Sequence, residues 1–152
     1  METAMREATE ADIPAILSLY AQLGQDDGTV LEPEDARRIW TRMATYPDYR
    51  IYVAIRETDV VGAFALLIMD NLAHRGTPSA VIEDVVVKQE MRGQGIGRRM
   101  MMFARKLCRE KGCYKMAFSS NRNRTQAHRF YESSGFNIHG YSFSIETEAE
   151  TR

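Results

Sequence analysis

The residues most suggestive of chemistry form a glycine-rich loop, Arg92-Gly93-Gln94-Gly95-Ile96-Gly97, between a predicted strand and a predicted helix. The first N–H groups of a helix have no intrahelical acceptor, and the helix dipole adds partial positive charge there. Glycines let the backbone approach a phosphate closely and adopt positive φ. Arg98 and Arg99 add formal positive charge at the helix start. The loop therefore predicts an anion-binding site that suits phosphate groups.

Three kinds of phosphate ligand compete for this loop, and a plain strand-to-helix turn is the alternative to all three. A P-loop requires Lys followed by Ser or Thr after its last glycine, where this sequence has Arg98-Arg99. A dinucleotide fingerprint requires a glycine where Arg98 stands, and here the loop lies in the middle of the chain. The third ligand is the pyrophosphate of coenzyme A, which the loop by itself does not distinguish from a plain turn.

Hydrophobic periodicity and turn signals predict the elements that position this loop. Helices are predicted at residues 12–23, 33–45, 95–111 and 125–134, and strands at residues 6–9, 51–56, 60–69, 80–88, 114–119, 136–139 and 141–145. Asp12 is expected to cap the first helix. The hairpin around residues 57–59 implies antiparallel pairing, whereas strand–helix–strand in the second half implies a parallel pair with a right-handed crossover. The predicted fold class is therefore α/β (α+β), a mixed sheet with helices on both faces.

Length and composition indicate one globular domain spanning residues 1–152, with 44% hydrophobic and 27% charged residues. A net charge of −1 gives no global attraction to nucleic acid or to an anionic membrane. No apolar run is long enough to span a bilayer, and the first twelve residues lack the apolar segment of a secretory signal. We therefore expect no nucleic-acid or membrane partner.

The cysteines and histidines argue against a metal site. Cys108 and Cys113 flank Gly112 at a spacing that is neither a zinc pair nor a redox CxxC, which favours two reduced thiols in a cytoplasmic protein. The three histidines show no metal-ligand spacing. The sequence therefore predicts no metal and a cytoplasmic location.

Two motifs, in the right order and on the right elements, resemble the GNAT superfamily of N-acetyltransferases. The segment Ile82-Glu83-Asp84-Val85-Val86-Val87 followed by the glycine loop resembles its acyl-CoA motif, and Ala127–Phe136 resembles its final helix and strand. The resemblance covers the chain in element order, is residue-specific from about Ile82 to Phe143, and is closest to small stand-alone bacterial members. It implies a three-layer α/β/α sandwich whose mostly antiparallel sheet has about seven strands and splays between the fourth and fifth.

The resemblance also implies acetyl-CoA as the acetyl donor and assigns residues to it. Main-chain N–H groups of the loop would bind the pyrophosphate, and the strand before it would offer backbone groups to the pantetheine arm. An asparagine before the final helix would contact the coenzyme, with Asn121 preferred to Asn123 on position. The full predicted set is Val85, Val86, Val87, Arg92, Gly93, Gln94, Gly95, Ile96, Gly97, Arg98, Asn121 and Asn123.

Two residues are candidates for proton transfer. Tyr131 matches the tyrosine that in the superfamily protonates the departing thiolate, and Glu83 is the candidate base for the attacking amine, with water as the alternative. If strand pairing is regular, Asp84 points to the opposite side, so only one of the two acids faces the cleft. The acceptor is expected to contact Tyr20, Trp40, Glu83 and Asp84. The acidic region at residues 25–35 would suit a cationic amine, although a solvated acidic loop explains it equally.

The expected activity is transfer of an acetyl group from acetyl-CoA to a primary amine of a small molecule, in a ternary complex and without an acyl-enzyme. Three alternatives stay open: a protein or peptide amine as acceptor, a sensor that binds acetyl-CoA without turnover, and a purely structural interaction domain. A homodimer is implied by the resemblance only.

Overall fold

The structure is a computed structural model that describes residues 2–147, and its chain divides into two units, Met1–Phe118 and Ser119–Arg152. The strands of the first unit are β1 Ala4–Glu7, β2 Tyr49–Arg56, β3 Asp59–Met69, β4 Ser79–Val87 and β5 Met116–Ala117. Its α-helices are α1 Ile13–Ala21, α2 Pro33–Met43 and α3 Ile96–Glu110. The second unit contains α4, Thr125–Ser133.

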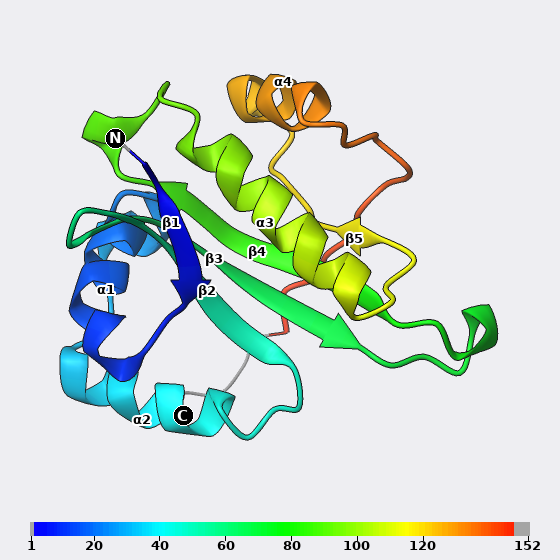
Figure 1. Cartoon of the computed structure of the whole chain (residues 1–152), viewed down its shortest axis with the longest axis horizontal. Coiled ribbons are helices and arrows are strands. Elements are labelled where there is room, and N and C mark those ends of the chain that lie inside the picture. Colours follow the sequence, from blue (N-terminus) through cyan, green and yellow to red (C-terminus); the bar gives the residue numbers. More distant parts are fainter. Residues whose placement is uncertain (1, 148–152) are drawn as a thin grey trace. The chain divides into compact units, whose positions relative to one another are not determined.

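The sheet follows the chain order, β1-β2-β3-β4-β5, with five strands within residues 2–147 (Figure 1). The first three pairings are antiparallel and the pairing of β4 with β5 is parallel, across a connection that contains α3. The mixed sheet, the hairpin and the parallel pair expected from the sequence are therefore confirmed.

Helices cover both faces of this sheet because its strands alternate apolar side chains toward each face. One face packs against α1 and α2, where Ile16 and Leu19 meet Val53, Ala63 and their neighbours. On the other face, the ring of Tyr52 stacks on Phe64 at 5.4 Å and meets the edge of Phe103 of α3 at 5.8 Å. Helix, sheet and helix thus form three layers in the first unit.

Gly62 in β3 allows α3 to lie close to the sheet. A Cβ atom at this position would stand 2.8 Å from Sδ of Met100 and 3.1 Å from the main-chain oxygen of Val86. Met100 is fully buried in α3, so the contact has little room to relax. The missing side chain of Gly62 therefore fixes how closely the helix that follows the glycine-rich loop approaches the sheet.

The sequence overestimated the C-terminal strands. Residues 136–147 form no strand, and the large side chains of Ile138, Tyr141, Phe143 and Ile145 are exposed. The strand predicted at residues 114–119 is shortened to β5. Because the two strands predicted at residues 136–139 and 141–145 are missing, the sheet has five strands within the described residues and not seven. Apolar residues do alternate in this segment, but a strand also needs a neighbouring strand that accepts its hydrogen bonds. No strand is paired with residues 136–147.

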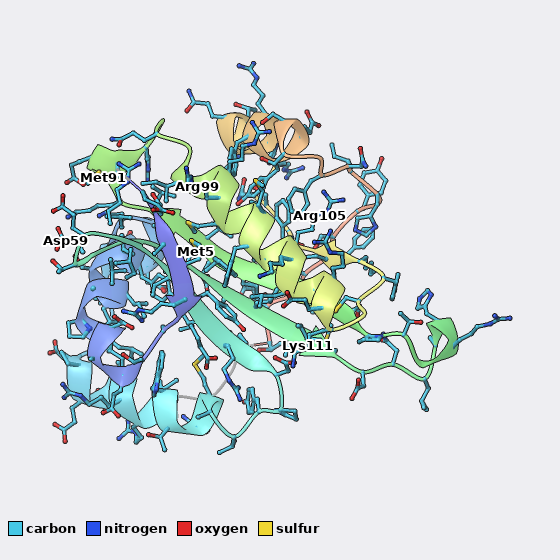
Figure 2. The ribbon with its side chains drawn as sticks, in the orientation of Figure 1. Met5, Asp59, Met91, Arg99, Arg105 and Lys111 are labelled. Atoms are coloured by element: carbon cyan, nitrogen blue, oxygen red, sulfur yellow. The ribbon has the colours of Figure 1, made fainter. Side chains whose placement is uncertain are left out.

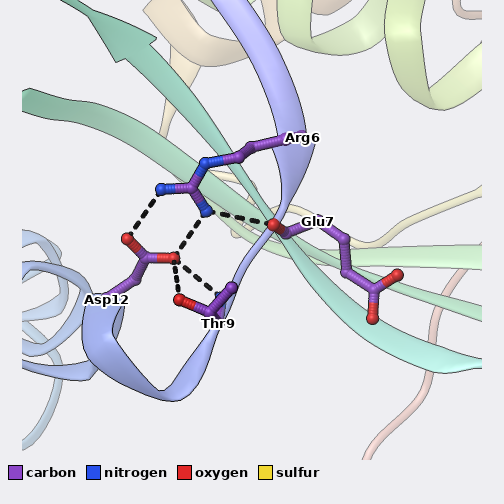
Figure 3. A network of polar contacts seen from close by, with 4 residues as sticks. All are labelled: Arg6, Glu7, Thr9 and Asp12. Atoms are coloured by element: carbon purple, nitrogen blue, oxygen red, sulfur yellow. Dashed lines mark hydrogen bonds and ion pairs between the residues drawn. The ribbon is translucent and has the colours of Figure 1, made fainter. Parts of the chain in front are cut away.

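Asp12 precedes α1 as expected, but its carboxylate does not cap that helix. It instead accepts hydrogen bonds from the main-chain N–H of Thr9 at 2.7 Å and from both terminal nitrogens of Arg6 at 2.7 and 2.9 Å (Figure 3). The acid therefore ties the end of β1 to the turn that leads into α1. Among the helices in the described part of the chain, none is long and apolar enough to cross a membrane.

Candidate active site

The glycine-rich loop forms an open start to α3. Gly93 and Gly95 have φ of +75° and +79°, in the left-handed region that favours glycine, and no atom lies within 4 Å of the position of a Cβ at either residue. Gly95 occupies the N-cap position, where no side chain caps the helix, and the first turn contains no acid. The first N–H groups of α3 therefore lack an intrahelical acceptor, and no acidic side chain lies in the first turn. Both conditions favour the binding of a phosphate.

The polar side chains of the loop are tethered to the surrounding fold. Nε of Arg92 donates to the main-chain oxygen of Val87 at 3.3 Å, which ties the loop to the end of β4. The guanidinium of Arg56 donates to the side-chain oxygen of Gln94 and also to the hydroxyl of Thr3. Ile96 is 1% exposed, so its side chain belongs to the core and only its backbone can serve a ligand.

The basic residues after the loop follow the exposed side of α3. Arg98 and Arg99 are both exposed, and Figure 2 shows Arg99, Arg105 and Lys111 along this helix. Lys111 pairs with Asp48 at 3.2 Å, at the far end from the loop. Arg98 and Arg99 are therefore available to solvent at the helix start, where they add positive charge.

The outer edge of β4 is paired over only part of its length. β5 pairs with β4 at Ala80 and Val81 alone, so the strand runs on to Val87 without a β5 partner. The splay expected between the fourth and fifth strands stays a prediction, since β5 is too short to follow β4 toward the glycine-rich loop. Val86 is 3% exposed and belongs to the core, as expected for a residue that would offer only its backbone.

The pairing of β4 with β3 is irregular at the two acids. Ala65 pairs with Glu83 and Ala63 with Val86, so Asp84 and Val85 together face the single residue between the two alanines. Asp84 has φ of +51°, and such a left-handed residue in a widened register is a β-bulge. The expectation that Asp84 points away from Glu83 assumed regular alternation, and the bulge removes that assumption.

A cavity of about 280 Å³ lies between the α1/α2 layer and the sheet, and Asp84 lines it. Most of its wall is apolar, including Ile16, Leu17, Leu23, Leu31, Ile39 and Met43. Tyr20 and Trp40, the two aromatic residues assigned to the acceptor, line it together with Asp84, Asp26, Gln25 and Thr29. The structure therefore brings together three of the four predicted acceptor contacts, from α1, α2 and β4.

The pKa values around this cavity reflect its apolar wall and its acids. Burial raises the pKa of Asp84 although the residue as a whole is exposed, because the wall removes water from part of its surroundings. Burial and then the charge of Asp84 raise the pKa of Tyr20. Burial, followed by the charges of Glu83 and Asp84, raises the pKa of Tyr49. The charge of Asp84 thus raises the pKa of both tyrosines, and the charge of Glu83 raises the pKa of Tyr49.

The remaining predicted residues lie in the second unit. Tyr131 of α4 is 8% exposed and its ring meets Phe136 edge-on at 5.8 Å. Burial raises the pKa of its hydroxyl, and Arg124 offsets part of this rise. Asn121 and Asn123 share the turn before α4, where the side-chain oxygen of Asn121 accepts from the main-chain N–H of Asn123 at 2.9 Å. Tyr131 is therefore protonated at neutral pH, as a proton donor must be.

Sequence reasoning missed Tyr49, Ile51 and the bulge. The period of two places Tyr49 and Ile51 on the same face as Val53, and this signal could have assigned both residues to the α1/α2 side. For the bulge the only signal was an aspartate in a valine-rich strand, since Asp tolerates the left-handed region better than most residues. No cluster of His, Cys, Asp or Glu that could hold a metal ion occurs in the described residues.

Comparisons with known proteins agree on one family. The model of the acetyltransferase (GNAT) family matches residues 13–136, which reach into both units. The aminoalkylphosphonate N-acetyltransferase of Salmonella typhimurium strain LT2 is 28% identical over 92% of this chain and 88% of its own length. The glucosamine 6-phosphate N-acetyltransferase of Trypanosoma brucei brucei is 36% identical, over 53% of this chain and 52% of its own. A solved structure from Agrobacterium tumefaciens strain C58 is 33% identical, with a TM-score of 0.89 over 95% of this chain and 99% of that one.

Proposed function

We propose a reaction for this chain, which belongs to the acetyltransferase (GNAT) family and is an N-acetyltransferase. In this reaction it acetylates the primary amine of a small molecule directly from bound acetyl-CoA. The observation that carries this proposal is the adjacency, within one unit, of three features. They are the open start of α3, the partly unpaired edge of β4, and the cavity lined by Asp84. These features supply a phosphate site, a place for an extended arm, and a hollow for the acceptor.

The donor would be held by main-chain groups. N–H groups from Gln94 to Gly97 suit the pyrophosphate, because left-handed Gly93 and Gly95 leave the start of α3 open. The outer edge of Val85 to Val87 suits the amide groups of the pantetheine arm, which would pair with β4 as an added strand does. Arg92 and Arg98 add positive charge beside the phosphates.

The reaction would form one C–N bond and break one C–S bond. The neutral amine attacks the thioester carbonyl, and Glu83, directly or through a water molecule, takes the proton that the nitrogen loses. A main-chain N–H of β4 polarises the carbonyl oxygen, and Tyr131 gives its proton to the departing thiolate. The hydroxyl of Tyr131 is protonated at neutral pH, as this role requires. The products are the acetamide and coenzyme A.

Substitution of Tyr131 tests the mechanism. Tyr131→Phe should lower kcat by roughly 100-fold, in the range lost when a general acid is removed, while the KM for acetyl-CoA changes little. Steady-state release of coenzyme A measures both constants. Tyr141→Phe is the matched control, because Tyr141 lies in the same unit and is 93% exposed. Wild-type turnover by Tyr131→Phe with an accepted amine would rule out the role of Tyr131.

Substitution of Glu83 separates a carboxylate base from a water. Glu83→Gln should lower kcat for an accepted amine, and Glu110→Gln at the exposed end of α3 should not. An unchanged kcat in Glu83→Gln would assign proton removal to water.

The binding-only alternative is tested by stability and turnover together. Acetyl-CoA at 100 times its dissociation constant should raise the free energy of unfolding by about 2.7 kcal/mol, as measured by thermal unfolding. Stabilisation without acetylation of any amine, amino acid, polyamine, aminosugar or peptide would favour a sensor. Absence of stabilisation would favour a structural domain. A homodimer stays a prediction that sedimentation velocity can test.

A further inference from the structure

We infer that the acceptor is a hydrophobic amine without a phosphate or other anionic group, with its ammonium group at Asp84 and its apolar body in the cavity between α1, α2 and the sheet. The inference rests on the proposed function and names the acceptor class of the same site. It differs from the phosphonate and phosphate acceptors named for the two relatives.

The charges around the cavity carry this inference. Asp26 and Asp84 are its only charged lining residues within residues 2–147, and no Lys, Arg or His lines it. A phosphate or phosphonate group placed there would meet two like charges and an apolar wall without a positive partner, which is unfavourable. An ammonium group, in contrast, would gain a partner at Asp84.

A second hollow adjoins this cavity, and its charged lining residues within residues 2–147 are Glu7 and Arg50. It has a volume of about 200 Å³ and shares Trp40, Met43 and Ile51 with the first cavity. Its one basic residue is Arg50, which donates to the main-chain oxygens of Tyr46 at 3.0 Å and Tyr49 at 2.8 Å. Nε of Arg50 also lies 3.4 Å from a carboxylate oxygen of Glu7. These contacts fix the position of the guanidinium and offset part of its positive charge, so it attracts a phosphate less than an unpaired cation would.

The size and lining of the cavity indicate what kind of body the amine has. Benzene occupies a dry apolar cavity of about 150 Å³, so the observed volume of about 280 Å³ admits an aromatic ring and a short alkyl chain. Trp40 offers aromatic surface, while Leu17 and Ile39 offer aliphatic surface. A sugar phosphate would leave several hydroxyl groups against this wall without partners, which is unfavourable.

The position of Asp84 orients such an amine for the reaction. Asp84 lies in the bulge of β4, directly before the backbone proposed to bind the pantetheine arm. An ammonium group beside Asp84 would thus lie at the β4 side of the cavity, with the apolar body toward α1 and α2. Glu83, the candidate base, is the residue directly before Asp84 in β4 but does not line the cavity.

Four probes test the acceptor class with the whole chain as one protein, three of them amines and one an alcohol. The kcat/KM for 2-phenylethylamine should exceed that for 2-aminoethylphosphonate and for glucosamine 6-phosphate by on the order of 100-fold. Isothermal titration calorimetry in the presence of coenzyme A should detect binding of 2-phenylethylamine. It should detect no binding of the matched alcohol 2-phenylethanol.

A charge variant tests where the amine binds. Leu31 lines the cavity and is 45% exposed, so Leu31→Arg can place a cation at the rim without disturbing the core. It should weaken 2-phenylethylamine binding by about tenfold through like-charge repulsion. Leu72→Arg makes the same change at a fully exposed residue outside the cavity and should leave binding unchanged.

The outcomes separate this inference from the proposed function. Faster turnover of either anionic probe, or equal binding by the Leu31→Arg and Leu72→Arg variants, would overturn the acceptor class and leave the acetyltransferase intact. Tight binding of 2-phenylethylamine that Leu31→Arg weakens, without coenzyme A release from any amine, would support the inference about the cavity and overturn the catalytic proposal.

Discussion

At the scale of single residues, the same chemical type serves different purposes according to its partners. Asp84 lies beside an apolar wall that raises its pKa, whereas Asp12 is held by Arg6 and Thr9, and its pKa falls to about 2. The first environment makes a carboxylate ready to meet a cation, and the second makes it a structural tie. Sequence position distinguished neither of these uses.

The Arg6–Asp12 pair predicts a specific acid sensitivity (Figure 3). The hydrogen bond from Arg6 is the main cause that lowers the pKa of Asp12 from 3.8 to about 2. A carboxyl group whose pKa is lower in the folded state stabilises the fold at pH values above its unfolded-state pKa. This contribution is lost as the pH falls from about 4 to about 2. Asp12→Asn should therefore lower the free energy of unfolding at pH 7 by about 1–2 kcal/mol, after allowing for the half-exposed Arg6.

Urea unfolding at pH 7 and at pH 3 measures this effect, which should be smaller at the lower pH. Asp35→Asn is the control, because its pair with Arg38 is exposed on α2 and should contribute less than about 0.5 kcal/mol. Equal effects of the two substitutions at pH 7 would contradict the assignment.

At the scale of elements, α3 connects the core to the candidate site. Its buried side includes Ile96, Met100 and Ala104, while its open first turn forms the proposed phosphate site. The helix can serve both purposes because Gly62 lets it pack closely on β3. Its distance from the sheet therefore affects both stability and the position of the glycine-rich loop.

Gly62→Ala should destabilise the protein by about 1–3 kcal/mol, since the added methyl group would approach Met100 and the backbone of Val86 too closely. Urea unfolding measures the loss, and the KM for acetyl-CoA should rise with it because α3 is displaced. Gly140→Ala, where nothing lies within 4 Å of the added methyl group, is the control. If Gly62→Ala behaves like this control, α3 does not pack as closely as described.

At the scale of the whole molecule, stability should concentrate in the centre of the sheet. Val53, Ala63 and Phe64 are fully buried and lie in the long antiparallel pairing of β2 with β3. Residues 138–145, in contrast, expose their large side chains and lie outside any strand. The two regions should therefore differ in how readily their backbone amides meet water.

Native-state hydrogen exchange should show the slowest amides in β2 and β3, near the free energy of global unfolding, and fast exchange in residues 138–145. Two-dimensional NMR after transfer to D₂O measures both. Strong protection at Tyr141, Phe143 and Ile145 would mean that the strand expected from their alternation does form. It would then require a partner strand that the described residues do not show.

Local pattern carried much of the fold and of the donor site. The periodicity of residues 96–107 predicted α3, and Gly112 follows its end as expected. The glycine loop at residues 92–97, together with the second motif at residues 127–136, predicted the coenzyme through the resemblance, and the family match agrees with that resemblance. Such features depend on residues that are close together in the chain, so the sequence pattern alone is enough to predict them.

Other features were decided by contacts between distant segments. Alternation alone predicted strands at residues 136–145, but a strand forms only where a neighbour accepts its hydrogen bonds. The bulge at Asp84 arises from its register against β3, and Asp84 lines the cavity on the α1/α2 side. Within residues 2–147, the amino-acid sequence by itself determined the four α-helices, the first four strands, the glycine-rich loop and the family. Only the tertiary structure decided the bulge and the cavity without lining cations, because both depend on segments that are far apart in the chain.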